Sequence, residues 1–167
     1  MHAQRKVSSA RPYGRQAWRP APVRARIGLA MRRSMSFGHM GEAEGALRAQ
    51  GLSLAPMAMS DGPISDGGVM VMPTATVEHL SDGSLKALVV PAGAPEADLD
   101  VLRDMVGRAH AAGIPIFAFG EGVAAALKAL DRAPAAFTTT PGVMIQGDEV
   151  LMLSDVDALT AAAARVG

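Results

Sequence analysis

The chain has 167 residues, enough for one domain with a sizeable core, and its 49% hydrophobic and 19% charged residues are normal for a globular α/β protein. It has no cysteine, which excludes disulfides, thiolate metal sites and a cysteine nucleophile. The net charge is zero, but residues 1–33 hold nine of the sixteen basic side chains and none of the sixteen acids, as an interaction arm often does. No apolar run approaches the ~18 residues that span a bilayer, and no secretory signal is visible, so we expect no membrane contact and a cytoplasmic protein.

Residues 1–23 show neither a helical nor a strand period and are rich in Pro, Ser, Gly and Arg, which predicts a basic, flexible N-terminal extension. The domain is expected over residues 24–167, where strand-like and helix-like segments alternate. The buried-strand candidates, in chain order, are 25–31, 52–59, 85–93 and 114–120. The helix candidates are 40–51, 96–113, 121–130 and 154–166.

Three local signals refine these elements. Gly51 is expected to cap the first helix in the left-handed conformation, and Ser154 or Asp155 to cap the start of the last one. Residues 69–77 follow two Asp-Gly turn signals and predict a small extended excursion at a sheet edge. Residues 135–153 predict two extended pieces around a Gly-Asp turn.

The alternation of strands and helices predicts a flavodoxin-like α/β fold, a three-layer sandwich with a mainly parallel sheet. The strand candidates are continuous apolar runs, as strands buried on both faces should be. Ligands of such sheets bind at the carboxyl ends of the strands, so a site is expected in the loops after residues 31, 93 and 119.

Two segments carry a resemblance to a known family. "ALVVPAG" (87–93) stands where that family typically has Ala-Leu-Val-Leu-Pro-Gly-Gly, and "PIFAFGEG" (115–122) where it has Pro-Val-Ala-Ala-Ile-Cys-His-Gly. With the order of elements around them, they make residues 24–160 resemble the ThiJ/PfpI superfamily, within the class I glutamine amidotransferase-like fold. The resemblance implies that fold, and it directs attention to the turn at residues 119–122.

The resemblance also implies that the catalytic residues of this family are missing. Active members have a strained cysteine at this turn, a glutamate on the first helix that hydrogen-bonds its thiol, and often a histidine in a Thr-Thr-His-Pro-like stretch. Here those positions fall on Gly120, on His39 (or, with a shifted alignment, on Glu42 or Glu44) and on Thr140. The sequence therefore predicts a degenerate catalytic site.

A closer likeness is to the C-terminal domain of large-subunit catalases, which also lacks the cysteine. That domain has Pro-Ile-Ala-Leu-Ala-Gly-Asp at the same turn, and "SDGGVMVMPTATV" (65–77) is similar to another of its segments. The heme-binding catalase body is absent from this chain, so the likeness does not imply catalase chemistry. It implies a structural or stability-related role.

The candidate pocket consists of His39, Gly93, Gly120, Glu121 and Gly122. Glu121 at a helix N-terminus is explained by the helix dipole alone, but it could also serve as a general base or a ligand contact, paired with His39. The glycines allow close backbone approach and could leave N–H groups free for an anion. No His/Asp/Glu cluster has the spacing of metal ligands, so we expect neither a metal nor a cofactor.

The extension is the second candidate site. Its basic and aromatic residues are Arg5, Lys6, Arg11, Tyr13, Arg15, Trp18 and Arg19. This composition suits docking on an acidic protein partner or on the acidic body of a neighbouring subunit. Nucleic-acid binding is a weaker alternative, with arginines for phosphates and the aromatic rings for stacking. An organellar transit segment and an inert tail are also open.

The sequence thus favours a non-catalytic ThiJ/PfpI-like domain that acts as a homo-oligomeric binding, scaffold or regulatory module, in stress protection for example. The alternatives are an active hydrolase, lyase or glyoxalase-like enzyme that uses Glu121 and His39, and a platform whose extension binds nucleic acid or a partner. Met57, Met59, Met70 and Met72 alternate along two strand candidates, which predicts core or dimer-face positions.

Overall fold

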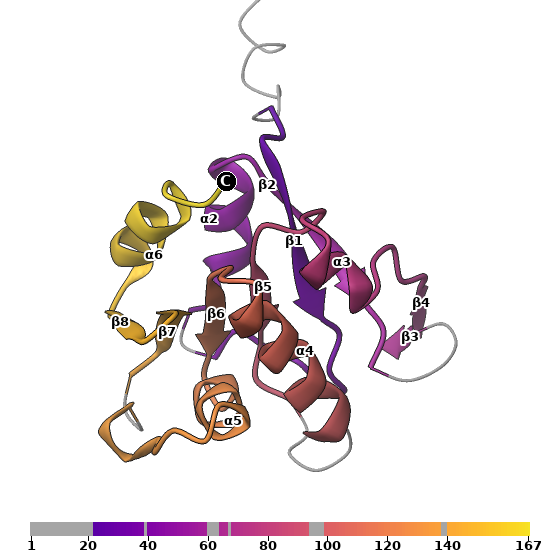
Figure 1. Ribbon diagram of the computed structural model, residues 1–167. Coiled ribbons are helices and arrows are strands. Elements are labelled where there is room, and N and C mark those ends of the chain that lie inside the picture. The colour runs from indigo at the N-terminus through magenta and orange to yellow at the C-terminus, as the bar shows by residue number, and fades with distance from the viewer. Residues whose placement is uncertain (1–21, 39, 60–63, 67, 94–98, 138–139) are drawn as a thin grey trace, which may run out of the picture.

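The computed structural model describes residues 22–38, 40–59, 64–66, 68–93, 99–137 and 140–167. A six-stranded sheet with the order β2-β1-β5-β6-β7-β8 forms the middle of the molecule (Figure 1). Its strands are β1 (Ala25–Ala30), β2 (Leu52–Met57), β5 (Leu88–Val90), β6 (Ile116–Phe119), β7 (Gly142–Gln146) and β8 (Glu149–Leu153). The first four run parallel, whereas β7 and β8 are antiparallel to their neighbours.

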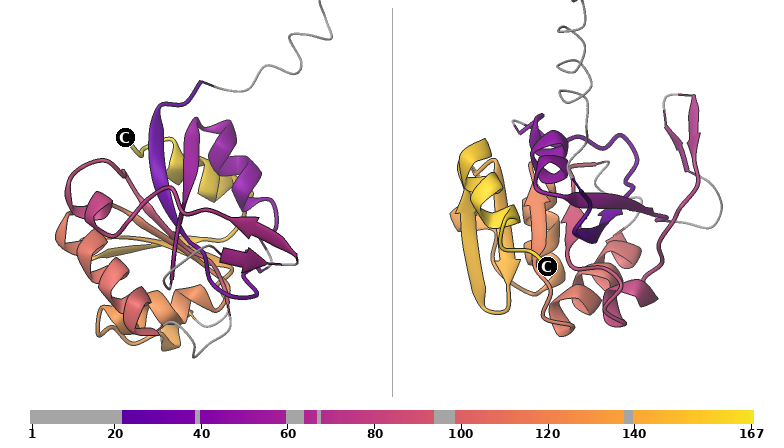
Figure 2. Two further views of the ribbon diagram at one scale, coloured as in Figure 1. Left: turned by 90° about the vertical axis from the view of Figure 1, so that its right-hand side faces the viewer. Right: turned by 90° about the horizontal axis from the view of Figure 1, so that it is seen from above.

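Helices cover both faces of the sheet, as Figure 2 shows. On one face lie α2 (Ala43–Ala49) and α6 (Val156–Ala163); on the other lie α3 (Glu78–Ser81), α4 (Leu99–Ala111) and α5 (Gly122–Ala129). The strand β6 explains this layering. Ile116 and Ala118 pack into the core on the α4 and α5 side, and Phe117 and Phe119 into the core on the α2 and α6 side. The predicted flavodoxin-like three-layer sandwich is confirmed.

The caps form largely as predicted. Gly51 adopts φ +78° after α2, in the left-handed region where glycine has no steric penalty. Of the two candidates for the last helix, Asp155 is the cap: its side chain accepts a hydrogen bond from the Ala158 N–H at 2.8 Å. Across the described ranges, no helix has the length and apolar character needed to span a bilayer.

The predicted excursion is shorter than expected and is half of a hairpin. Only β4 (Val69–Val71) is extended, and it pairs antiparallel with β3 (Ile64–Asp66), which the sequence suggested as part of a turn. The hairpin stands away from the main sheet in the right-hand view of Figure 2. The candidate 85–93, a strand that leads into a Gly/Pro loop, forms the three-residue strand β5, and the chain leaves the sheet at Pro91.

Candidate functional site

The loops after β1, β5 and β6 meet at the carboxyl end of the sheet. Ser36 and Ala92 form an isolated antiparallel bridge, with each N–H donating to the other's carbonyl, at 3.1 and 2.9 Å. The rings of Phe37 and Phe119 meet edge to face, 5.3 Å between centroids and 74° between planes. The loop after β1 is therefore fastened to the loop after β5 and to the end of β6.

Gly120 occupies the turn between β6 and α5 with φ +55°, a conformation that strains any residue with a Cβ atom. Its N–H donates to the Pro141 carbonyl at 3.1 Å, and its own carbonyl accepts from Val123 at 3.1 Å. A Cβ atom added here would lie 3.2 Å from the Ala92 Cβ and 3.7 Å from the Gly38 Cα. The turn has the geometry of a nucleophile elbow, but it presents no side chain and neighbouring atoms crowd the position.

The other two pocket glycines serve close packing. A Cβ on Gly122 would lie 2.5 Å from the Val90 carbonyl oxygen, so the start of α5 rests directly on the end of β5. A Cβ on Gly93 would lie 2.7 Å from the Cβ of Arg32. The anion-binding hypothesis is weakened, because the Gly120 N–H is already donated and carbonyl oxygens face Gly122.

Glu121 is exposed at the N-cap of α5, and its carboxylate makes no capping hydrogen bond. Its backbone carbonyl accepts from Ala125 at 3.3 Å. His39, the proposed partner, lies outside the described residues, but a Cβ on its neighbour Gly38 would be 3.4 Å from the Gly120 Cα. Gly38 therefore lies beside the turn that carries Glu121.

The other positions that the resemblance singled out are Thr140 and, as alternatives to His39, Glu42 and Glu44. Thr140 is half-buried, and its N–H donates to the Phe137 carbonyl at 3.2 Å. Glu42 and Glu44, the alternatives to His39, line a groove between α2 and α6, and Glu44 is paired with Arg48 at 2.6 Å. Within the described ranges, no three His, Asp or Glu side chains come close enough to hold a metal ion.

Three of the nine basic side chains in residues 1–33 are bonded to the folded domain. Arg26 donates to the Thr74 carbonyl at 3.1 Å, and Arg32 is 3% exposed and donates to the Pro91 carbonyl at 3.0 Å. Arg24 hydrogen-bonds to backbone carbonyls of α2 and α6. All three lie in the part of the chain, residues 24–167, that the sequence predicted as the domain. All seven named residues of the extension, Arg5 to Arg19, lie outside the described residues.

The four methionines divide into two pairs. Met57 and Met59 are buried, as core residues should be, whereas Met70 and Met72 are 67% and 66% exposed.

A cavity of about 490 Å³ lies at the end of β2 beside α4. It is lined by Met57, Ala58, Met59, Pro73, Thr74, Ala75, Thr76, Val77, Val101 and Met105.

No known family profile matches the sequence, and no curated protein sequence does. Solved structures match over most of the chain. A DJ-1 superfamily protein from Agrobacterium tumefaciens is 18% identical, with a TM-score of 0.53 over 82% of this chain and 86% of that one. Oxidized DJ-1 from Toxoplasma gondii is 15% identical, with a TM-score of 0.54 over 83% and 86%.

A third match is an AraC family transcriptional regulator from Pseudomonas putida, 13% identical, with a TM-score of 0.55 over 83% of this chain and 88% of that one. At these identities the likeness defines the fold. The chain has the fold of the DJ-1/ThiJ/PfpI superfamily, which confirms the resemblance drawn from the two sequence segments. The three matches described here do not bear on the closer likeness to the catalase domain.

Proposed function

We propose that this chain is a non-catalytic DJ-1/ThiJ/PfpI-like module that works as a homo-oligomeric binding, scaffold or regulatory protein. The turn at Gly120 is the observation that carries the proposal. The position lacks a nucleophile, and the first atom of any replacement side chain would contact Ala92. The cysteine-free composition supports a cytoplasmic location, which fractionation of native cells would test.

The oligomer is proposed to form through the β3–β4 hairpin. Val69, Met70 and Met72 on or directly after β4 are each more than 60% exposed, an unusual concentration of large apolar side chains on one short segment. Methionine is common at adaptable contact surfaces because its side chain is flexible and polarizable. A two-fold arrangement would bring two copies of the hairpin together and bury both sets.

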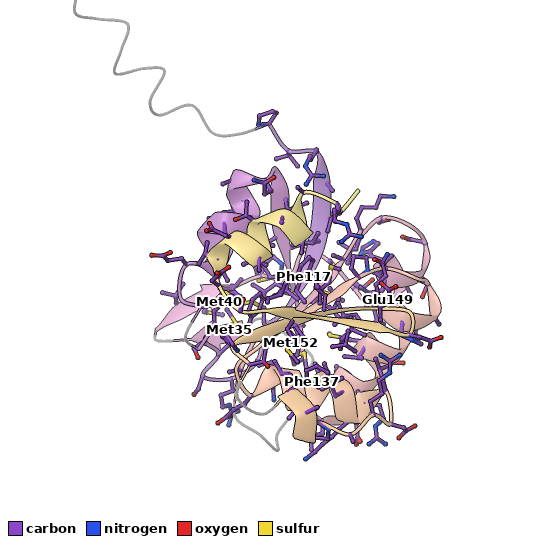
Figure 3. The ribbon with its side chains drawn as sticks, turned by 90° about the vertical axis from the view of Figure 1, so that its left-hand side faces the viewer. Met35, Met40, Phe117, Phe137, Glu149 and Met152 are labelled. Carbon is purple, nitrogen blue, oxygen red and sulfur yellow. The ribbon has the colours of Figure 1, made fainter. Side chains whose placement is uncertain are left out.

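Replacing Met70 and Met72 by aspartate tests this contact, with light scattering after size-exclusion chromatography as the measurement. Met152 on β8, 51% exposed on the last strand of the sheet, provides the control (Figure 3). We expect the hairpin variant to be monomeric and the Met152→Asp variant to keep the native mass. A monomeric wild-type protein would contradict the homo-oligomer. If the mass fell only in Met152→Asp, the contact would instead be formed by β8.

An active enzyme that uses Glu121 with His39 is the second candidate. The free, exposed carboxylate of Glu121 favours it, as does the contact of Gly38 with the turn. In this mechanism Glu121 would act as the general base or hold the substrate.

Turnover of methylglyoxal and of activated esters separates the two candidates. Glu121→Gln is compared with Glu149→Gln, which changes an exposed glutamate on β8. Under the non-catalytic proposal, the wild type and both variants show no turnover above buffer. Turnover by the wild type and by Glu149→Gln, together with its loss in Glu121→Gln, would replace the proposal with the enzymatic one.

A further inference from the structure

The described part of the chain begins with residues 22–24, which lie against the C-terminal ends of α2 and α6. A Cβ on Gly51 would lie 2.7 Å from the Pro22 carbonyl oxygen, so the chain passes directly over the end of α2. Arg24 donates to the carbonyls of Gln50 at 2.5 Å, Ala163 at 2.7 Å and Val166. A cation is favoured there, because unpaired carbonyls make helix C-termini negative. Arg24 therefore fixes the start of the described chain beside the C-terminal ends of these two helices.

A shallow groove of about 690 Å³ leads from this point along α2 and α6. It is lined by Gly41, Glu42, Glu44, Gly45, Ala46, Arg48, Ala49, Gln50, Val156 and Thr160. Asp155 and Asp157 lie next to Val156 at the start of α6, and both are exposed. Arg48 is the one basic residue of the lining, and it is paired with Glu44. The far end of the groove is thus acidic.

Residues 1–21 have the complementary charge and sufficient length. They contain five Lys or Arg and no acid. Fully extended, 21 residues reach about 70 Å, whereas the seven residues of α2 rise only about 10 Å. The direction is also suitable, because the segment starts at the C-terminal ends of the two helices and the acids lie toward their N-terminal ends.

We propose that residues 1–21 dock in the acidic groove between α2 and α6 of their own chain. Attachment at Arg24 favours docking in the same chain, since a short tether holds the segment near the groove at an effective concentration of about millimolar. The basic side chains would lie over Glu42, Glu44 and Asp157, with Arg24 as the fixed end. Docking in this groove depends neither on the chemistry at Gly120 nor on the hairpin contact.

Trp18 allows a direct test in the full-length protein, because it is the single tryptophan of the chain and lies in this segment. Quenching of its fluorescence by the neutral quencher acrylamide measures how accessible the ring is. A synthetic peptide of residues 1–21 supplies the value for an undocked segment. We expect weaker quenching in the protein than in the peptide at low salt. The protection should disappear near 1 M salt, where the screening length falls to about 3 Å.

A matched pair of variants locates the docking surface. Glu42→Gln with Glu44→Gln removes two acids at the start of α2, including the partner of Arg48. Asp100→Asn with Asp104→Asn removes two acids from α4, including the partner of Arg108 at 3.1 Å, on the other face of the sheet. We expect loss of Trp18 protection in the first variant and none in the second, with circular dichroism confirming that both are folded.

Four results would overturn the proposal. Quenching equal to that of the peptide at low salt would mean that the segment is undocked, and equal loss in the two variants would mean that its attraction is not to the groove. Protection that rises with protein concentration would place the segment on another copy. Protection that nuclease removes would assign it to bound nucleic acid. The salt titration of the wild type needs no variant and decides the first of these outcomes by itself.

Discussion

Replacing Gly120 by alanine is the sharpest test of the turn between β6 and α5. At φ +55° a residue with a Cβ atom loses roughly 1–2 kcal/mol relative to glycine. Alanine regains about 0.4–1 kcal/mol because it restricts the unfolded chain. The new Cβ would also meet the Ala92 Cβ at 3.2 Å, and relieving such a contact costs about 1–3 kcal/mol. We therefore expect Gly120→Ala to lower the free energy of unfolding by about 1–5 kcal/mol.

Urea unfolding followed by far-ultraviolet circular dichroism measures this change. Tryptophan fluorescence is unsuitable, because Trp18 lies in the N-terminal extension. Gly45→Ala in α2 is the control: a Cβ there meets no atom within 4 Å, and alanine in a helix should stabilise by about 0.5–1 kcal/mol. If Gly120→Ala were neutral or as stabilising as Gly45→Ala, the turn would be neither left-handed nor crowded, and the argument for a blocked elbow would fail.

Three further predictions concern other elements. Gly122→Ala should destabilise by about 3 kcal/mol or more, since its Cβ would lie 2.5 Å from the Val90 carbonyl oxygen; a stable variant in urea unfolding would contradict the packing of α5 on β5. Asp155→Ala should lower stability by about 0.5–2 kcal/mol through loss of the cap on α6, whereas Asp155→Asn should retain most of it. Ser84 donates hydrogen bonds to the Asp82 carboxylate through its side chain and through its N–H, the latter at 2.8 Å, and these bonds hold the pKa of Asp82 below 3.8. The stability that they add to the folded state is present above pH 3.8. It is lost as the pH falls through the folded-state pKa of Asp82. The stability of Asp82→Asn should accordingly depend less on pH below 3.8, and urea unfolding at several acidic pH values would show whether it does.

The main strands of the sheet could be predicted because a strand buried on both faces consists of consecutive apolar residues, which the sequence shows directly. Ile116 to Phe119 are all apolar because their side chains point alternately into the two cores, as in a strand that is buried on both faces. The strand β3 could not be predicted in this way. Ile64–Asp66 is three residues long and lies between two Asp-Gly signals, so the local signal is that of a turn, and only pairing with β4 makes it extended.

The candidate site was predictable in outline and not in detail. The meeting of the three loops follows from a parallel sheet, whose strands all end at one edge. The contacts that decide what the glycines do come from residues far away in the sequence, such as Arg32 against Gly93. Arg24 and Arg32 carry the same charge as the arginines of residues 1–21. Charge alone does not reveal that Arg24 donates hydrogen bonds to the ends of two helices or that Arg32 is buried.

The identity of the residue at position 120 links the fold to the proposed function. The turn between β6 and α5 requires a left-handed residue whether or not it carries chemistry, because the chain must reverse from the strand into a helix that rests on β5. A nucleophilic residue at this position would be strained by roughly 1–2 kcal/mol, a cost that is tolerated where the residue is needed for catalysis. Glycine makes the same turn without that strain. A glycine elbow packed against Ala92 is therefore the arrangement that our proposal of a non-catalytic module predicts for this turn.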